Sequence, residues 1–151
     1  MLIQSQSSAV LSLSPHADDH DTLANILRLE KWTMHRAATV PRATRLLERY
    51  PIGVVICERD VPPRGWMDLI PEIAAIQNPP PLIVTSRHAD DRFWAEALNL
   101  GAYDVLPKPF DAAEVRRIVN IAVLHWEWRR ERSAPLVSAA GASRANGAGD
   151  Q

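Results

Sequence analysis

The sequence predicts an α/β fold built on an open, doubly wound parallel sheet of five strands with five helices. Short apolar runs alternate with longer segments of helical periodicity, and this alternation is typical of strand–helix units repeated around a parallel sheet. One run, Gly-Val-Val-Ile-Cys at 53–57, is apolar throughout, as expected for a central strand covered on both faces. At 151 residues, the chain is long enough for one domain with a substantial core.

Each expected strand is a short run rich in apolar residues. Turn-forming residues separate the strands from the helices: Ser14-Pro15 follows the first strand, and Pro79-Pro80-Pro81 precedes the fourth. Where parallel strands end, their carboxyl ends share one edge of the sheet, and ligands collect there. In chain order the expected strands are 9–13, 32–37, 53–57, 82–84 and 103–106.

The expected helices are marked by apolar residues at helical spacing and by capping residues. Pro41 suits the first turn of the second helix, because its missing N–H group is not needed there. Asp90 or Asp91 is a candidate cap for the fourth helix, which Gly101 ends. In chain order the expected helices are 19–29, a segment opened by Pro41, 66–76, 90–100 and a last helix from about 111.

Composition and charge argue against several classes of protein. The formal net charge of -1 gives no electrostatic reason to expect direct binding to nucleic acid or to an anionic membrane. No apolar stretch approaches the roughly 20 residues that span a bilayer, and the N-terminus lacks the features of a signal peptide. The single cysteine, Cys57, lies in an apolar run, which indicates a reducing compartment. We therefore expect a soluble, cytoplasmic protein.

The ends of the chain differ in composition from its middle. We expect a flexible N-terminus at 1–8, the folded domain at 9–130 and a disordered tail at 131–151, where Ala, Gly, Ser and Asn predominate. Because this tail is too short and too polar to fold, we expect a stand-alone domain whose output passes through another chain.

Polar side chains stand at the carboxyl ends of four expected strands. They are Ser14, Glu58, Thr85 and Lys108. Their order, spacing and placement closely resemble the receiver domain of response regulators in two-component and phosphorelay signalling, from about Ala9 to Trp126. The resemblance implies a flavodoxin-like sheet with strand order 2-1-3-4-5.

The resemblance also implies roles for the residues at the strand ends. Glu58 takes the position of the phospho-acceptor aspartate, and Pro62 follows at the family's spacing. Thr85 corresponds to the hydroxyl residue that binds a phosphoryl oxygen. Lys108-Pro109 reproduces a lysine–proline pair that the family joins by a cis peptide bond.

Two departures from the family pattern affect the acceptor and its metal. Glu58 carries one methylene more than aspartate, which moves its oxygens by about 1.5 Å. Where the family has an acidic pair that holds Mg²⁺, this chain has Ser14-Pro15. Asp18 and Asp19 follow and are weak metal candidates, although each is also suited to a helix start. Mg²⁺ is therefore expected only if the domain accepts phosphate.

A third departure concerns the family's switch aromatic, whose position holds Val105. Tyr103 lies two residues earlier, and strand alternation predicts that it shares a sheet face with Val105. It is thus a candidate substitute, with an ordinary core or surface tyrosine as the alternative.

These observations favour a degenerate receiver-like module that acts through protein contacts without phosphate. In this hypothesis Glu58 reaches Lys108 and Thr85 and serves as a partial phosphomimic, because it carries about one negative charge against nearly two for a phosphoryl group. The alternative is a functional phospho-acceptor receiver with an unusual metal site. In neither case is the protein expected to be an enzyme.

An alternative of the enzyme class is a small hydrolase that uses Thr85 or Ser86 as nucleophile with His88 and Asp90. The chain has no Gly-x-Ser-x-Gly elbow, and three residues of one loop rarely reach the required geometry. We therefore do not favour this reading.

The expected partners are proteins: a sensor kinase, a regulator or an output protein. Two tryptophans near the end of the last helix favour a homodimer or a partner contact, with packing back against the sheet edge as the alternative. The candidate interface residues are Trp94, Tyr103, Trp126 and Trp128.

Overall fold

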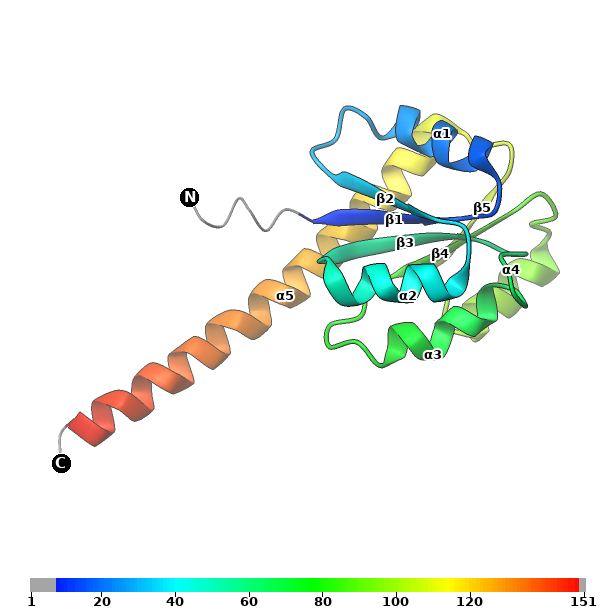
Figure 1. Cartoon of the computed structure of the whole chain (residues 1–151). Helices are drawn as coiled ribbons and strands as arrows, with labels where there is room; N and C mark the ends of the chain where they lie inside the picture. Colours follow the sequence, from blue (N-terminus) through cyan, green and yellow to red (C-terminus); the bar gives the residue numbers. More distant parts are fainter. Residues whose placement is uncertain (1–7, 150–151) are drawn as a thin grey trace.

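The computed structural model describes residues 8–149, with side chains as far as Arg132. Five parallel strands form one sheet in the order β2-β1-β3-β4-β5, with helices on both faces (Figure 1). This arrangement confirms the predicted doubly wound fold and its strand order. The strands are β1 Ala9–Leu13, β2 Thr33–Ala37, β3 Ile52–Glu58, β4 Leu82–Ser86 and β5 Asp104–Pro107. The helices are α1 Ala17–Ile26, α2 Val40–Arg49, the 3-10 turn η2 Trp66–Asp68, α3 Leu69–Ala74, α4 Asp91–Asn99 and α5 Ala112–Gly149.

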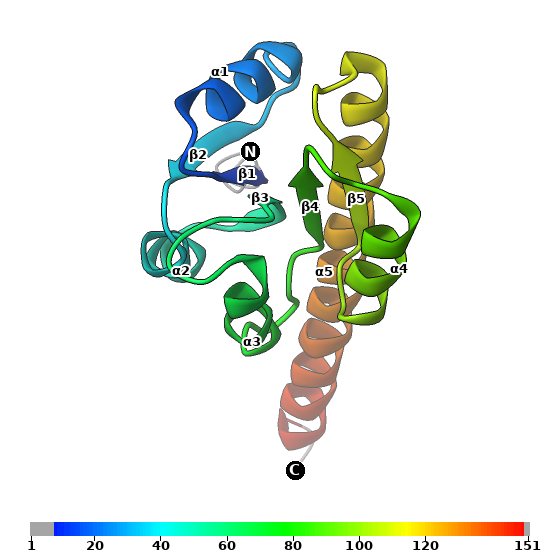
Figure 2. The same cartoon turned by 90° about the vertical axis from the view of Figure 1, so that its right-hand side faces the viewer.

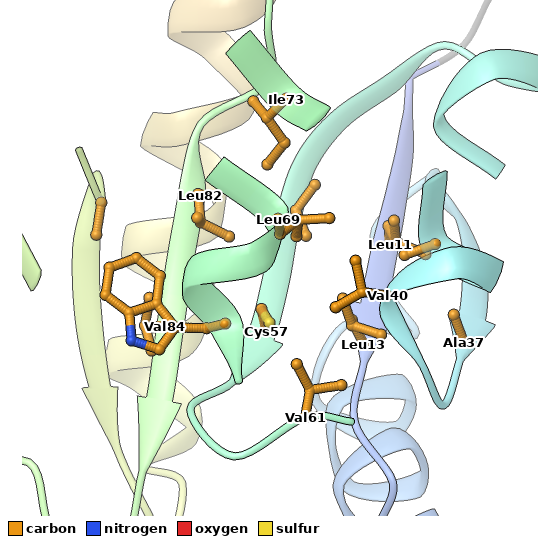
Figure 3. Packing of buried hydrophobic residues seen from close by; sticks show 14 of the residues in the cluster. Leu11, Leu13, Ala37, Val40, Cys57, Val61, Leu69, Ile73, Leu82 and Val84 are labelled. Atoms are coloured by element: carbon orange, nitrogen blue, oxygen red, sulfur yellow. The ribbon is translucent and has the colours of Figure 1, made fainter. Parts of the chain in front are cut away.

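The sheet separates two apolar clusters. Helices α2, α3 and α4 contribute to the cluster on one face, and α1 and α5 to the cluster on the other (Figure 2). Strand alternation divides β3 between them, so that Val55 and Cys57 face the first cluster while Val54 and Ile56 face the second. Figure 3 shows Cys57 within the first cluster, below Leu69. Because β3 is buried on both faces along its whole length, its apolar sequence has a direct structural cause.

Capping side chains begin two of the helices; the positions of Pro41 and Asp90 were predicted, and the cap by Thr39 was not. The Thr39 side chain accepts a hydrogen bond from the Arg42 N–H at 3.4 Å, and Pro41 occupies the first turn of α2. Of the two candidate caps for α4, Asp90 accepts the Phe93 N–H at 2.8 Å. These local signals set where the helices start, and hence where the loops at the sheet edge lie.

The last helix differs from the sequence expectation. A disordered tail was predicted for 131–151, whereas α5 continues as a helix to Gly149 and projects away from the sheet (Figure 1). Helical hydrogen bonds are made within the segment itself, and alanine, which recurs in this segment, is a strong helix former. Within the described residues, no helix is long and apolar enough to cross a membrane.

The N-terminal boundary also lies slightly earlier than expected. Ser8 was assigned to a flexible segment, yet it is buried and its hydroxyl donates to Glu127 of α5 at 2.5 Å. Pairing of β1 with its neighbours places Ser8 against the helix that covers this face. The remaining residues of the predicted flexible segment, 1–7, and the final two of the predicted tail, 150–151, lie outside the described residues.

Candidate functional site

The carboxyl edge of the sheet gathers the polar residues predicted from the strand ends. Glu58 is the last residue of β3 and pairs in register with Thr85 of β4. Ser14 follows β1 directly, and Lys108 follows β5. Because all strands run in the same direction, residues separated by up to 94 positions in the chain meet at one edge.

Lys108 is at the centre of this site. Its ammonium group forms an ion pair with Oε1 of Glu58 and a second with Oδ2 of Asp19, the latter at 2.9 Å. The exposed fractions of the three side chains are 7%, 5% and 12%, respectively. A buried charge needs a partner of opposite sign, so each member of this triad depends on the others. The peptide bond between Lys108 and Pro109 is cis.

Neutral donors complete the coordination of both carboxylates. The Ser14 hydroxyl donates to Oδ2 of Asp19 at 2.7 Å, and the Asp60 backbone N–H donates to Oε2 of Glu58 at 2.7 Å. Burial opposes the ionisation of Asp19, but the hydrogen bonds from Lys108 and Ser14 outweigh it, so the pKa of Asp19 lies below its ordinary value. The site thus holds two carboxylates against one ammonium group.

Beneath the triad lies a buried histidine that the sequence did not single out. Nδ1 of His20 lies 2.7 Å from the Ser12 hydroxyl, and its Nε2 lies 2.9 Å from the carbonyl oxygen of Ser14. A neutral ring satisfies both contacts, with Nε2–H donating and Nδ1 accepting. Burial lowers the pKa of His20, although its hydrogen bond to Ser14 opposes the shift. No sequence pattern separates such a histidine from an exposed one on the same helix.

The residues at this edge do not fit a Mg²⁺ site. Asp18, one of the weak candidates, is exposed, and Asp19, the other, is engaged by Lys108 and Ser14. Across the described residues, no group of three or more His, Cys, Asp or Glu side chains could hold a metal ion. Mg²⁺ prefers several oxygen ligands in an octahedral array, whereas here an ammonium group lies between the two available carboxylates.

Thr85 and the predicted switch positions are not part of this triad's hydrogen-bond network. The Thr85 side chain is buried beside Glu58, but among the described residues no hydrogen bond joins its hydroxyl to Glu58 or Lys108. Val105 is buried in the cluster under α2, α3 and α4, while Tyr103 packs against the opposite cluster. The predicted common face for these two residues is therefore wrong. Tyr103 precedes β5, which begins at Asp104, so strand alternation does not extend to it.

The residues of the hydrolase alternative stabilise backbone turns instead of one another. The Ser86 hydroxyl accepts the backbone N–H of His88 at 3.0 Å, and the Asp90 carboxylate caps α4. In the part of the chain with described side chains, no hydrogen bond connects the Ser86 hydroxyl to the His88 ring. A nucleophile with a hydrogen-bonded base is not assembled here.

The four candidate interface residues have different surroundings. Trp126 is 5% exposed and packs on β3, where a Cβ added at Gly53 would lie 3.1 Å from its ring. Trp94 and Tyr103 are half-buried against the two apolar clusters. Trp128 is 57% exposed and is the one tryptophan of the described side chains with most of its surface in solvent. The alternative of packing back on the sheet therefore holds for Trp126.

Known proteins with similar sequences are transcriptional regulators. The DNA-binding transcriptional regulator NtrC of Klebsiella pneumoniae is 31% identical over 86 residues, which are 56% of this chain and 18% of NtrC. The transcriptional regulatory protein FixJ of Bradyrhizobium diazoefficiens is 30% identical over 71 residues, which are 47% of this chain and 35% of FixJ. The chain thus matches between 18% and 35% of the length of these relatives.

Solved receiver domains share the fold. The signal receiver domain of an HD domain-containing protein from Pseudomonas fluorescens Pf-5 superposes with a TM-score of 0.75, at 24% identity, over 84% of this chain and 94% of that one. At this identity the likeness concerns the fold alone. The family model of the response regulator receiver domain matches residues 15–120, which include α1, β3 and the Lys108 turn. Together with the five-stranded sheet and its strand-end site, this match shows that the chain belongs to the response regulator receiver domain family.

Proposed function

We propose that this receiver domain acts as a phosphate-independent protein-interaction module, in which Glu58 partly imitates a phosphorylated acceptor. One observation carries the proposal: the Lys108 ammonium group bridges the buried carboxylates of Glu58 and Asp19. In a phosphorylated receiver the corresponding lysine would neutralise phosphoryl oxygens. Here the Glu58 carboxylate already supplies a negative partner, so the bridge needs no phosphate.

The same contacts oppose phosphoryl transfer to Glu58. For transfer, a carboxylate oxygen must be free to attack in line while cations neutralise the transferred group. Both oxygens of Glu58 accept hydrogen bonds, one from Lys108 and one from the Asp60 N–H. The extra methylene moves the oxygens by about 1.5 Å, and a misplacement near 1 Å already costs on the order of a hundredfold in rate.

Charge balance supports the same conclusion. Two carboxylates and one ammonium group sum to a formal charge of -1 in a largely buried site. A phosphoryl group would add about −1.5 to −2, and the residues present do not fit a divalent cation that could offset it. The domain is instead suited to stay in one conformation and to present its surfaces to a kinase, a regulator or an output protein.

The test is intact-mass spectrometry after incubation with acetyl phosphate and Mg²⁺. Wild type, Glu58→Asp and Glu58→Gln are compared, because the Asp variant restores the acceptor and the Gln variant removes the nucleophile. We expect no phosphoryl adduct on the wild type. An adduct on Glu58→Asp alone would show that the rest of the pocket still supports transfer and that Glu58 itself is the block.

An adduct on the wild type that is absent from Glu58→Gln would overturn the proposal. The domain would then be a functional phospho-acceptor: an oxygen of Glu58 would form an acyl phosphate, and acetate would leave. A wild-type adduct that persists in Glu58→Gln but disappears in Asp60→Asn would assign the acceptor role to Asp60 and overturn the proposal in the same way.

A further inference from the structure

A groove of about 800 Å³ lies at the edge of the sheet opposite Glu58, where β4 and β5 begin. Ile73 of α3, Leu82 of β4 and Ala102 form a buried apolar floor. The walls come from the prolines at 79–81 on one side and from α5 on the other, where Trp128 lines the groove. Its volume falls within the range of typical ligand sites, and it shares none of its lining residues with the Glu58 site.

The walls of the groove are held in place before any partner arrives. The Trp126 Nε1–H donates to the Asn78 carbonyl at 3.0 Å, and the Asn78 side-chain amide donates back to the Trp126 carbonyl at 3.4 Å. One Arg129 nitrogen donates to the Pro79 carbonyl at 3.3 Å. These bonds tie the loop before β4 to α5. A preformed groove loses less conformational entropy when it binds a partner.

The exposed part of the groove carries the residue types that dominate binding energy at protein interfaces. Trp128 is 57% exposed, and the Arg132 guanidinium lies 4.6 Å from the centre of its ring. On the β5 side, the Tyr103 hydroxyl lies 3.1 Å from Nδ1 of His125. Trp, Tyr and Arg are the commonest interface hot spots, especially around an apolar pocket.

The charge of the groove has one sign. Among its described lining residues there is no Asp or Glu, while Arg129 stands at the rim and uses one of its five N–H donors on Pro79. Arg132 adds a second guanidinium beside Trp128. The chain as a whole has a formal charge of -1, so this concentration of positive charge is local. It complements carboxylates placed next to an apolar side chain.

We infer that this groove binds an acidic segment of a partner protein, which inserts a large apolar side chain between Pro81 and Trp128 and places carboxylates on Arg129 and Arg132. A segment without carboxylates would bury the apolar side chain but would form no ion pair with the two guanidinium groups. A basic segment would be repelled. This inference goes beyond the proposed function and does not depend on it, because the groove and the Glu58 site lie at opposite edges of the sheet.

The test is fluorescence anisotropy with short fluorescein-labelled peptides. The probe has a central Phe-Leu pair flanked by Asp and Glu, and two control peptides replace either the flanks with Lys or the central pair with Ser-Ser. We expect the acidic probe to bind and the two control peptides not to bind, and we expect added salt to weaken the binding of the probe. Arg129→Glu combined with Arg132→Glu should weaken binding by about tenfold or more, and Trp128→Ala should do so by a comparable factor.

Arg117→Glu is the matched control, because Arg117 is exposed on the same helix outside the groove. It should change the affinity less than about twofold. The substituted side chains are solvent-exposed, and circular dichroism checks that each variant is folded. The inference would be overturned if the acidic and basic probes bound equally, or if the acidic probe did not bind. It would also be overturned if Arg117→Glu weakened binding as much as the Arg129→Glu/Arg132→Glu double variant. The inference would also be overturned if sedimentation showed a dimer of the wild type that Trp128→Ala abolishes, because a second copy of the chain would then occupy the groove.

Discussion

Replacement of Lys108 by Met tests the buried triad most directly. The substitution keeps the apolar stem but removes the ammonium group that lies between Glu58 and Asp19. Removing one partner of a buried ion pair costs about 3–5 kcal/mol, because the remaining charge stays buried without compensation. With the three side chains 5–12% exposed, we expect a loss of about 3–4 kcal/mol in the free energy of unfolding at pH 7.

Urea titration monitored by tryptophan fluorescence measures this loss. For a domain of this size the slope is about 1–3 kcal/mol per molar urea, so the midpoint should fall by about 2 M. Lys31→Met is the matched control, because Lys31 is exposed and its removal should change stability by less than about 0.5 kcal/mol. A double-mutant cycle with Glu58→Gln isolates the coupling between Lys108 and Glu58.

The pH dependence gives the loss a second signature. Without Lys108, Asp19 loses the cation that holds its pKa low, while its burial remains, so the pKa of Asp19 should rise above the unfolded value. Stability would then be lost as pH rises above about 4, so the gap between Lys108→Met and the wild type should widen between pH 4 and pH 7. A loss below about 1 kcal/mol at pH 7, with no change of the gap with pH, would refute the reasoning.

Three further predictions concern other buried residues. Gly53→Ala should cost about 1–3 kcal/mol, because its Cβ would lie 3.1 Å from the Trp126 ring; urea titrations should show a smaller cost in a Trp126→Leu background, and equal costs would contradict the contact. Because the pKa of His20 is lower in the folded protein than in the unfolded chain, its imidazole takes up a proton first in the unfolded chain as pH falls below about 6.5. The free energy of unfolding should therefore decrease as pH falls through this range. His20→Gln should reduce this slope in denaturation curves recorded across pH, and an unchanged slope would assign it to other groups. Burial, together with the Glu58 charge, raises the pKa of the Cys57 thiol well above its usual range, so iodoacetamide should label Cys57 only after unfolding; rapid labelling of the native protein would contradict this.

The strands were the most predictable part of the fold. All five lie within two residues of the expected bounds, because short apolar runs between turn formers leave few alternatives for a buried parallel strand. The strand-end positions of Glu58, Thr85 and Lys108 followed from the same runs. Helix ends were less predictable. Helix α1 begins at Ala17 and not at Asp19, and the preceding residue, His16, makes no side-chain capping hydrogen bond that would mark the start of the helix.

The contacts made by Asp19 could not be read from the sequence. It was a weak metal candidate, and its carboxylate instead meets Lys108, a residue 89 positions away. The pairing depends on where α1 lies relative to the turn after β5, which is set by the packing of α1 against β1 and α5. The absence of an acidic pair at Ser14-Pro15 was visible in the sequence, but the role of the Ser14 hydroxyl as a donor to Asp19 was not.

The two tryptophans of α5 also show that the sequence does not determine which side chains meet in the fold. Trp126 and Trp128 are two positions apart, so on a helix with 3.6 residues per turn they point to nearly opposite sides. The sequence determined that one would face the domain and the other solvent once the helix docked. Which one faces the domain was decided by tertiary packing, because Gly53 leaves room above β3 for the Trp126 ring.

By itself the sequence determined the sheet, the direction of its strands and the gathering of polar residues at their carboxyl ends, because these depend on local apolar patterning. The tertiary structure alone decided that Lys108 bridges two buried carboxylates and that Trp128 lines a preformed groove with Arg129. The first feature joins side chains that are distant in the chain. The second depends on which face of α5 is turned toward the sheet. Such contacts are set by the packing of whole elements, to which a local sequence pattern does not extend.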